Sequence, residues 1–147
     1  MAQSNLELMR EGFETYLREG VEVVLAVGNI DSEIEVYSEP GLVNAGTYYG
    51  HDGWRRFDAA WNEAWEEFGF EIEELIESDP SHVVAVVRYW ARGAGSGIEL
   101  GGERFAWLFE VRDGKLTRFH NYRTKENALT AARELAAAEP TRGGARG

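Results

Sequence analysis

The pattern of apolar and polar positions near the end of the chain predicts a β-hairpin. Apolar and polar residues alternate over 105–111 and again over 116–122, and Asp113-Gly114 lies between the two runs. An Asp-Gly pair in this position is typical of a tight two-residue turn, because the turn needs positive φ at both residues. The hairpin is the strongest local signal in the sequence.

A two-residue turn also fixes the register of the hairpin, because it pairs Arg112 with Lys115. Opposed residues share a face of the sheet. The expected pairs on one face are Trp107 with His120, Phe105 with Tyr122 and Phe109 with Arg118. We interpret this face as a pocket wall and the other, with Ala106, Leu108 and Phe119, as a packing surface. A single β-bulge would shift part of this assignment.

Steps of three and four residues between apolar positions predict helices in three places. They are residues 6–17, ended by Gly20; residues 54–68, capped by Asp52; and a last helix that starts at Thr124 or Asn127. Residues 21–27 read as a short helix or turn. The stripe of the second helix is almost entirely aromatic, which is more typical of a core than of a cofactor site.

Strand patterns account for most of the remaining chain. Residues 33–37 alternate and stop at Pro40-Gly41, and residues 42–49 read as a loop. Residues 70–76 alternate with glutamates, which is typical of an edge strand. Residues 82–92 are apolar on both sides and predict a central strand. Arg88 is an anomaly there, because an arginine on an apolar surface needs a partner or a water-filled cavity.

The element order predicts one α+β domain, with helices on one side of a curved sheet. We expect the domain to span residues 1–139 and residues 140–147 to form a disordered tail. The length of 147 residues and the 44% hydrophobic content suffice for a single core.

Charge and composition narrow the classes of partner. The net charge of −11 argues against binding to nucleic acid or to an anionic membrane. The absence of cysteine rules out disulfides and thiolate chemistry. The helix-like first residues contain no continuous apolar run for a signal peptide or membrane span, so we expect a soluble, cytoplasmic protein.

Neither a phosphate site nor a metal site is indicated by the motifs. Residues 93–97 are rich in glycine but lack the Lys-Ser/Thr of a P-loop and lie between strand signals, so a hairpin or pocket-rim loop fits better. His51, His82 and His120 stand far apart without metal-ligand spacing. We expect no metal and no cofactor.

Several motifs together resemble the SnoaL-like branch of the nuclear transport factor two-like superfamily. The resemblance covers residues 5–138. It rests on four segments, which are Gly50-His51-Asp52-Gly53 before the aromatic helix, the glycine-rich run 93–97, Arg112-Asp113-Gly114-Lys115, and Tyr122 followed by residues 125–129. The resemblance implies a cone-shaped barrel, in which a strongly curved mixed sheet wraps around helices and leaves a cavity on its concave face. It also implies a homodimer through the outer sheet face.

The family includes cyclases, isomerases, hydrolases, dehydratases and non-enzymatic modules, so the fold alone does not select an activity. Isomerases of the superfamily use a helix tyrosine, where this chain has Phe13, and a hairpin acid, which residues 105–109 lack. Tyr16 substitutes only in a different helix register. Cyclases use a His and an Asp on the hairpin strands, where this chain offers Trp107 and His120-Asn121.

His120 is the titrating group that we expect on the pocket face, as a proton shuttle. Its alternative role is a structural histidine packed against Trp107. Arg88 is a candidate anion stabiliser, and its alternative is an ion pair with Glu35 or another acid. The candidate ligand-binding residues are Tyr37, Trp61, Trp90, Trp107, Asn121 and Tyr122.

Two functions remain open at this point. The first is a pocket for a small apolar or weakly acidic ligand, which, if catalytic, supports a cofactor-free isomerase, cyclase or hydratase. The second is a non-catalytic ligand-binding or dimerisation module with the same pocket. The missing acid pair favours the second, and the polar groups among the aromatics keep the first open.

Overall fold

The computed structural model describes residues 5–27, 29–93 and 99–138. The helices and strands of this part of the chain are, in order, α1 (Asn5–Glu19), α2 (Val21–Val27), β1 (Ile30–Ser38), β2 (Gly46–Tyr49), α3 (Gly50–Ala64), β3 (Trp65–Asp79), β4 (His82–Gly93), β5 (Glu99–Arg112), β6 (Lys115–Tyr122) and α4 (Lys125–Ala137). The expected tail, 140–147, and most of the glycine-rich run, 94–97, lie outside the described residues.

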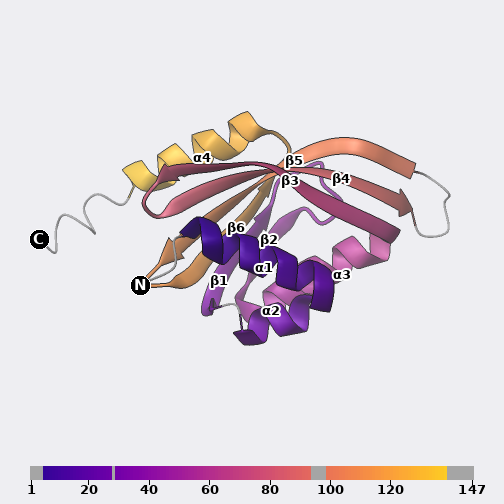
Figure 1. Cartoon of the computed structure of the whole chain (residues 1–147), viewed down its shortest axis with the longest axis horizontal. Coiled ribbons are helices and arrows are strands. Elements are labelled where there is room, and N and C mark those ends of the chain that lie inside the picture. The colour runs from indigo at the N-terminus through magenta and orange to yellow at the C-terminus, as the bar shows by residue number, and fades with distance from the viewer. Residues whose placement is uncertain (1–4, 28, 94–98, 139–147) are drawn as a thin grey trace, which may run out of the picture.

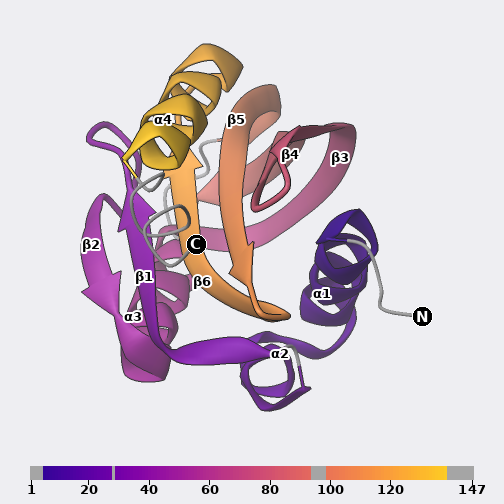
Figure 2. The same cartoon turned by 90° about the vertical axis from the view of Figure 1, so that its left-hand side faces the viewer.

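The strands form one six-stranded mixed sheet in the order β2-β1-β6-β5-β4-β3. β1 and β6 are parallel, and the other neighbours are antiparallel. The sheet is strongly curved, with α1, α2 and α3 on its concave side and α4 on the opposite side (Figures 1 and 2). The predicted α+β class and curved mixed sheet are confirmed. The sheet is not closed into a barrel, because β2 and β3 remain as edges.

Two helix boundaries follow the expected signals, and a third does not. Gly20 has a φ of +88° directly after α1, and Thr124 caps α4 by accepting a hydrogen bond from the Asn127 backbone N–H. The expected cap of α3, Asp52, is wrong, because the helix already begins at Gly50 with Tyr49 at the cap. Asp52 lies in the first turn and pairs with Arg55 at 2.6 Å.

Two further boundaries differ from the sequence pattern. The predicted loop 42–49 contains β2, a four-residue edge strand too short to show alternation. The aromatic helix ends at Ala64, and Trp65 is already extended, with φ −124° and ψ 129°. Trp65 and Phe68 therefore belong to β3, although their spacing continues the helical pattern.

The hairpin turn is confirmed, but the register beyond it is wrong. Asp113 and Gly114 have positive φ, and Arg112 pairs with Lys115. An irregularity between Glu110 and Val111 then shifts the pairing by one residue. The pairs that result are Ala106 with Tyr122, Trp107 with Asn121, Leu108 with His120, and Phe109 with Phe119.

A one-residue shift exchanges the two faces of a strand. Phe119 and Asn121 consequently face the concave side, and His120 and Tyr122 face the outer side. The shift buries Phe119, whose ring stacks on Trp54 with centroids 5.0 Å apart. Burial of this large ring provides a physical reason for the bulge, because the same ring on the outer face would remove less apolar surface from water.

The main core lies between the concave face and α1–α3, and the buried aromatic stripe Trp54, Phe57 and Trp61 belongs to it. A smaller core lies under α4, where Ala128 and Ala132 pack on Val84 and Leu108. None of the described helices is long and apolar enough to cross a membrane.

Candidate functional site

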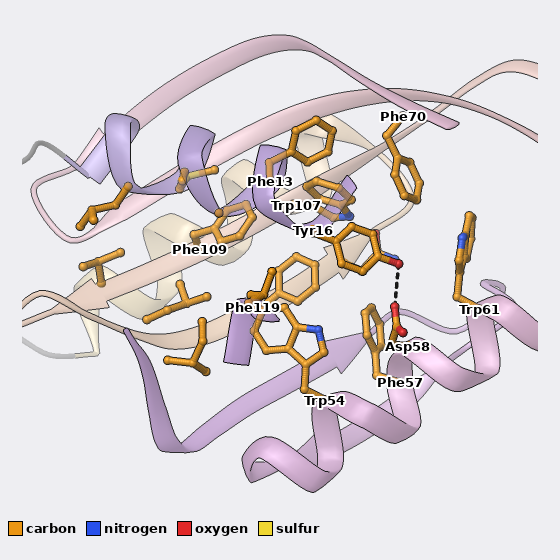
Figure 3. A pocket seen from close by; sticks show the side chains of 18 of the residues that line it. Phe13, Tyr16, Trp54, Phe57, Asp58, Trp61, Phe70, Trp107, Phe109 and Phe119 are labelled. Atoms are coloured by element: carbon orange, nitrogen blue, oxygen red, sulfur yellow. Dashed lines mark hydrogen bonds between the residues drawn. The ribbon is translucent and has the colours of Figure 1, made fainter. Parts of the chain in front are cut away.

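A pocket of about 110 Å³ opens between α1, α3 and the concave face of the sheet (Figure 3). Most of its wall is aromatic. The aromatic lining residues are Phe13, Tyr16, Trp54, Phe57, Trp61, Phe70, Phe105, Trp107, Phe109 and Phe119. A core cavity of similar size, about 150 Å³, is known to hold benzene. The volume therefore suits a ligand built on a small ring.

Helix α1 forms one wall of the pocket. Leu8, Met9, Gly12, Phe13 and Tyr16 line it, and steps of three and four residues place them on one face of a helix. Gly12 leaves open space at the centre of this face, because a Cβ atom built there meets nothing within 4 Å. A side chain at position 12 would therefore project from the pocket-lining face.

The polar centre of the pocket is a pair formed by Tyr16 and Asp58. The Tyr16 hydroxyl donates a hydrogen bond of 2.6 Å to Asp58 Oδ1 (Figure 3). Asn62 Nδ2 donates to Asp58 Oδ2 at 3.0 Å. The pair connects α1 with α3 and holds a carboxylate among aromatic rings.

Burial dominates the protonation of both groups. Burial raises the pKa of the Asp58 carboxyl above its usual value, and the hydrogen bonds from Tyr16 and Asn62 offset part of the rise. Burial and the neighbouring Asp58 charge raise the pKa of Tyr16 far above its usual value, so it remains protonated. Asp58 is thus a base that accepts a proton more readily than an exposed aspartate.

Two other polar groups in the wall have no hydrogen-bond partner in the described part of the chain. They are Oδ1 of Asn121 and Nε1 of Trp61, and both residues are more than nine-tenths buried. Asn44, also in the wall, already accepts a hydrogen bond of 2.7 Å from Ser38. Unpartnered buried groups cost about 1–3 kcal/mol each, and this cost falls on the fold.

Three residues expected at the site do line the pocket. Trp61 comes from α3, Trp107 from β5 and Asn121 from β6. Trp107 and Asn121 are direct cross-strand neighbours. Their role in ligand binding stays a prediction.

His120, Tyr37 and Tyr122 lie together, but on the outer face. His120 Nε2 is 2.7 Å from Glu35 Oε2, and its Nδ1 is 3.0 Å from the Tyr122 hydroxyl. The Tyr37 ring contacts His120 edge-on at 5.3 Å. The expected place of His120 on the pocket face is therefore wrong, and the bulge after Glu110 is the reason. Burial lowers the pKa of His120, with partial compensation by Glu35.

Arg88 and Trp90 also lie outside the pocket, on the exposed end of the outer face. The Arg88 side chain is 47% exposed and is 3.9 Å from Glu71. The Arg88 side chain is therefore exposed to solvent and does not lie on an apolar surface. Its acidic partner is Glu71 and not Glu35. Trp90 is 49% exposed and covers Gly69, where a Cβ atom would come within 2.2 Å of the indole.

A buried ionic network crosses the same outer face near α4. His82 Nδ1 is 2.9 Å from Asp79 and its Nε2 is 2.9 Å from Glu110, while Arg118 reaches both Glu110 and Glu35. Burial opposes the charge on His82, but the bonds to Glu110 and Asp79 outweigh it and raise its pKa. Burial likewise opposes charge on Glu110, yet its hydrogen bonds from His82 and Thr117 bring its pKa down to about 2.

In the described ranges, no group of three or more His, Cys, Asp or Glu side chains is arranged to hold a metal ion. The histidines remain separate: His51 contacts the Ile30 carbonyl, His82 lies in the ionic network and His120 contacts Glu35.

Sequence reasoning missed Asp58 as a site residue and placed Tyr16 outside it. A signal for Asp58 was present, because it follows Trp54 by four residues and precedes Trp61 by three. This spacing sets a carboxylate on the aromatic face of a helix. Tyr16 was on the apolar stripe of α1, and only the partner across the cavity distinguished it from a core aromatic.

Comparison with solved structures shows the fold. An NTF2-like protein of unknown function from Burkholderia pseudomallei K96243 matches with a TM-score of 0.73 and 18% identity, over 88% of this chain and 97% of that chain. A protein described as a SnoaL-like polyketide cyclase, from Jannaschia sp. CCS1, matches with a TM-score of 0.66 and 14% identity, over 90% and 96%.

A third structure contains a ligand. This Mycobacterium tuberculosis protein, solved in complex with estradiol-17β-hemisuccinate, matches with a TM-score of 0.65 and 16% identity, over 84% of this chain and 97% of that chain. Curated protein sequences include no significant match. The family model for the SnoaL-like domain matches residues 10–119. The chain therefore belongs to the SnoaL-like domain family, with an NTF2-like fold.

Proposed function

We propose that this protein binds a small, mostly apolar ring compound in the pocket between α1, α3 and the sheet. The observation that carries the proposal is the aromatic wall around the Tyr16–Asp58 pair. Pockets for small molecules characteristically combine apolar walls with a few placed polar groups. A neighbour of the same fold that holds estradiol-17β-hemisuccinate supports the proposal.

The pocket can be closed without disturbing the fold, which provides the test. Gly12→Leu puts a side chain into open space on the pocket side of α1, and Leu is a better helix former than Gly by about 0.8 kcal/mol. Benzyl alcohol titrated into the wild type is expected to change the fluorescence of Trp54, Trp61 and Trp107 to saturation. The Gly12→Leu variant should bind at least about tenfold more weakly.

Gly12→Ala is the matched control, because it improves the helix in the same way but fills little of the pocket. It should bind benzyl alcohol as the wild type does. Saturable binding that is equally strong in Gly12→Leu would place the probe elsewhere and overturn the proposal. The absence of saturable binding by any neutral or charged benzyl compound would do the same.

A second candidate function is cofactor-free proton transfer in the same pocket. The raised pKa of Asp58 favours it, because a general base works best when its pKa is close to the working pH. As Asp58 accepts a proton from carbon and loses its charge, the Tyr16 hydroxyl would turn from Asp58 and donate to the developing oxyanion. The expected readout is deuterium exchange next to the carbonyl of cyclohexanone in heavy water, lost in Asp58→Asn.

The expected homodimer through the outer face stays a proposal, and so does a cytoplasmic location. Helix α4 occupies one end of the outer face. The other end carries the exposed Trp90 beside Arg88, and we place the dimer contact there. Light scattering of the eluted protein would give a dimer mass for the wild type and a monomer mass for Trp90→Glu if this contact holds.

A further inference from the structure

The pocket has an unbalanced charge. Asp58 is its carboxylate, and no Lys, Arg or His occurs among the described residues that line it. Arg88, the cation expected there from the sequence, points to the outer face instead. A half-buried carboxylate without a positive partner is costly, and a cationic group beside it removes much of that cost.

The wall around this carboxylate is suited to the same kind of charge. Tyr16 contributes both its hydroxyl, which orients Asp58, and an aromatic ring to the wall. On α3, Phe57 directly precedes Asp58 and Trp61 follows it by three residues, and both rings line the pocket (Figure 3). The faces of aromatic rings carry negative potential and attract cations, by about 0.5–2 kcal/mol per contact. Carboxylates are repelled by the same faces.

The Asp58 carboxylate can accept further hydrogen bonds from a ligand. Each Asp58 oxygen accepts one bond from the protein, from Tyr16 or Asn62, and retains a further lone pair. An ammonium group can donate to these remaining lone pairs.

We propose that the pocket selects a protonated amine carried on a small apolar ring, with the ammonium group at Asp58 and the ring among the aromatic walls. The inference deepens the proposed function and rests on it. The net charge of −11 acts in the same direction, because it attracts cations and repels anions over the whole surface. The weakly acidic ligand that the sequence suggested depended on Arg88 and has no cationic partner in this wall.

Three probes of nearly equal size separate charge from shape. Benzylamine, benzyl alcohol and benzoate share one ring and differ in charge, and calorimetric titration gives the affinity of each. The expected order is benzylamine tightest, by about tenfold over benzyl alcohol, with benzoate weakest. The affinity for benzylamine should fall as the pH is lowered through the pKa of Asp58, which burial holds above its usual value.

Asp58→Asn tests the assignment to one residue. The amide keeps the size and an acceptor for Tyr16 but removes the charge, so benzylamine should lose its advantage over benzyl alcohol. Glu63→Gln is the control, because Glu63 is an exposed acid on the same helix and does not line the pocket. It should leave all three affinities unchanged. Circular dichroism confirms that each variant is folded.

The outcomes separate this inference from the function on which it rests. If benzylamine and benzyl alcohol bind equally, if benzoate binds tightest, or if the amine preference survives in Asp58→Asn, the charge selection is overturned and the apolar pocket remains. If none of the three binds, the proposed function fails as well.

Discussion

At the residue scale, one hydroxyl opposes the effect of burial on the pocket carboxyl. The Tyr16 hydroxyl donates to Asp58 and lowers the pKa of that carboxyl, against the stronger effect of burial, which raises it. Tyr16 and Asn62 therefore keep more of Asp58 charged at a given pH than burial alone would allow. Neither residue acts alone in the pocket, because the carboxylate without its donor would be costlier to bury.

His120 provides the first prediction. His120→Ala removes a buried ring and leaves Glu35 and Tyr122 without their shared partner. We expect a loss of about 2 kcal/mol in the free energy of unfolding, measured by urea titration. Binding of benzyl compounds should stay within about twofold of the wild type, because His120 faces away from the pocket.

A large loss of binding or of proton exchange in folded His120→Ala would contradict this assignment and restore His120 as a pocket residue. Tyr122→Phe is a milder control, since it removes the hydrogen bond from the Tyr122 hydroxyl but keeps the ring. It should cost less stability than His120→Ala, with no effect on binding.

Residue identity predicted the site only in part. Trp61, Trp107 and Asn121 were expected in the pocket and line it. His120 and Tyr122 were expected beside Trp107 and lie on the opposite face, because one extra residue at the bulge reverses the orientation of everything after it. The alternation of residues along a strand shows which side chains share a face, but it does not show which of the two faces points inward.

At the element scale, two helical glycines have opposite roles. Gly12 in α1 faces open space, whereas a Cβ atom on Gly53 in α3 would come within 2.9 Å of the Tyr48 backbone. Gly53 thus permits α3 to pack closely against the end of β2. Gly12 has no such neighbour.

The second prediction compares these two glycines. Gly12→Ala should raise the free energy of unfolding by about 0.8 kcal/mol, because Ala is the better helix former. Gly53→Ala gains the same propensity but must push the Tyr48 backbone away, so we expect a net loss of about 1 kcal/mol or more. Thermal and urea unfolding of the two variants measure the change in the free energy of unfolding and its sign for each.

Equal stabilisation by the two substitutions would contradict the close packing of α3 against β2.

The existence of most elements was predictable from the sequence, because long periodic runs such as α1, β4 and the hairpin carry their own signals. The end of α3 at Ala64 was not, since Trp65 and Phe68 continue the helical spacing although they already belong to β3. At this junction, Trp65 and Phe68 continue the spacing of the helix and also lie in the strand, so the sequence pattern does not mark the boundary.

At the scale of the whole molecule, the outer face is held by charges and the concave face by aromatic rings. Asp79, His82, Glu110, Arg118 and Glu35 connect β3, β4, β5, β6 and β1 in one ionic chain. Both ring nitrogens of His82 face carboxylates, which requires the charged imidazolium for two donated bonds. Stability of the sheet therefore depends on pH through this chain.

The third prediction concerns this pH dependence. The pKa of Glu110 is about 2 in the fold, against 4.5 ordinarily, so its contribution is present above about pH 4.5 and is lost as the pH falls toward 2. This contribution is on the order of 3 kcal/mol. The raised pKa of His82 has the opposite sign, since its contribution is present below its ordinary pKa of 6.5 and is lost as the pH rises through the raised value.

Urea midpoints measured from pH 2 to pH 8 should therefore fall on the acid side in the wild type, by the mechanism of linked protonation. Glu110→Gln should be less stable near neutrality and show a flatter acid limb. Glu63→Gln, an exposed control, should keep the slope of the wild type. A Glu110→Gln protein with an unchanged acid limb would show that Glu110 does not carry the dependence.

The sequence by itself determined most of the elements, the α+β class and the aromatic character of the core, because periodicity and turn chemistry are local properties of the chain. The curved mixed sheet was implied by the family resemblance. Only the tertiary structure decided where the chemistry lies. The Tyr16–Asp58 pair joins two residues that are 42 positions apart in the sequence, and the bulge after Glu110 moves His120 away from the pocket. Both depend on which long-range packing buries the most apolar surface, and no local pattern contains that choice.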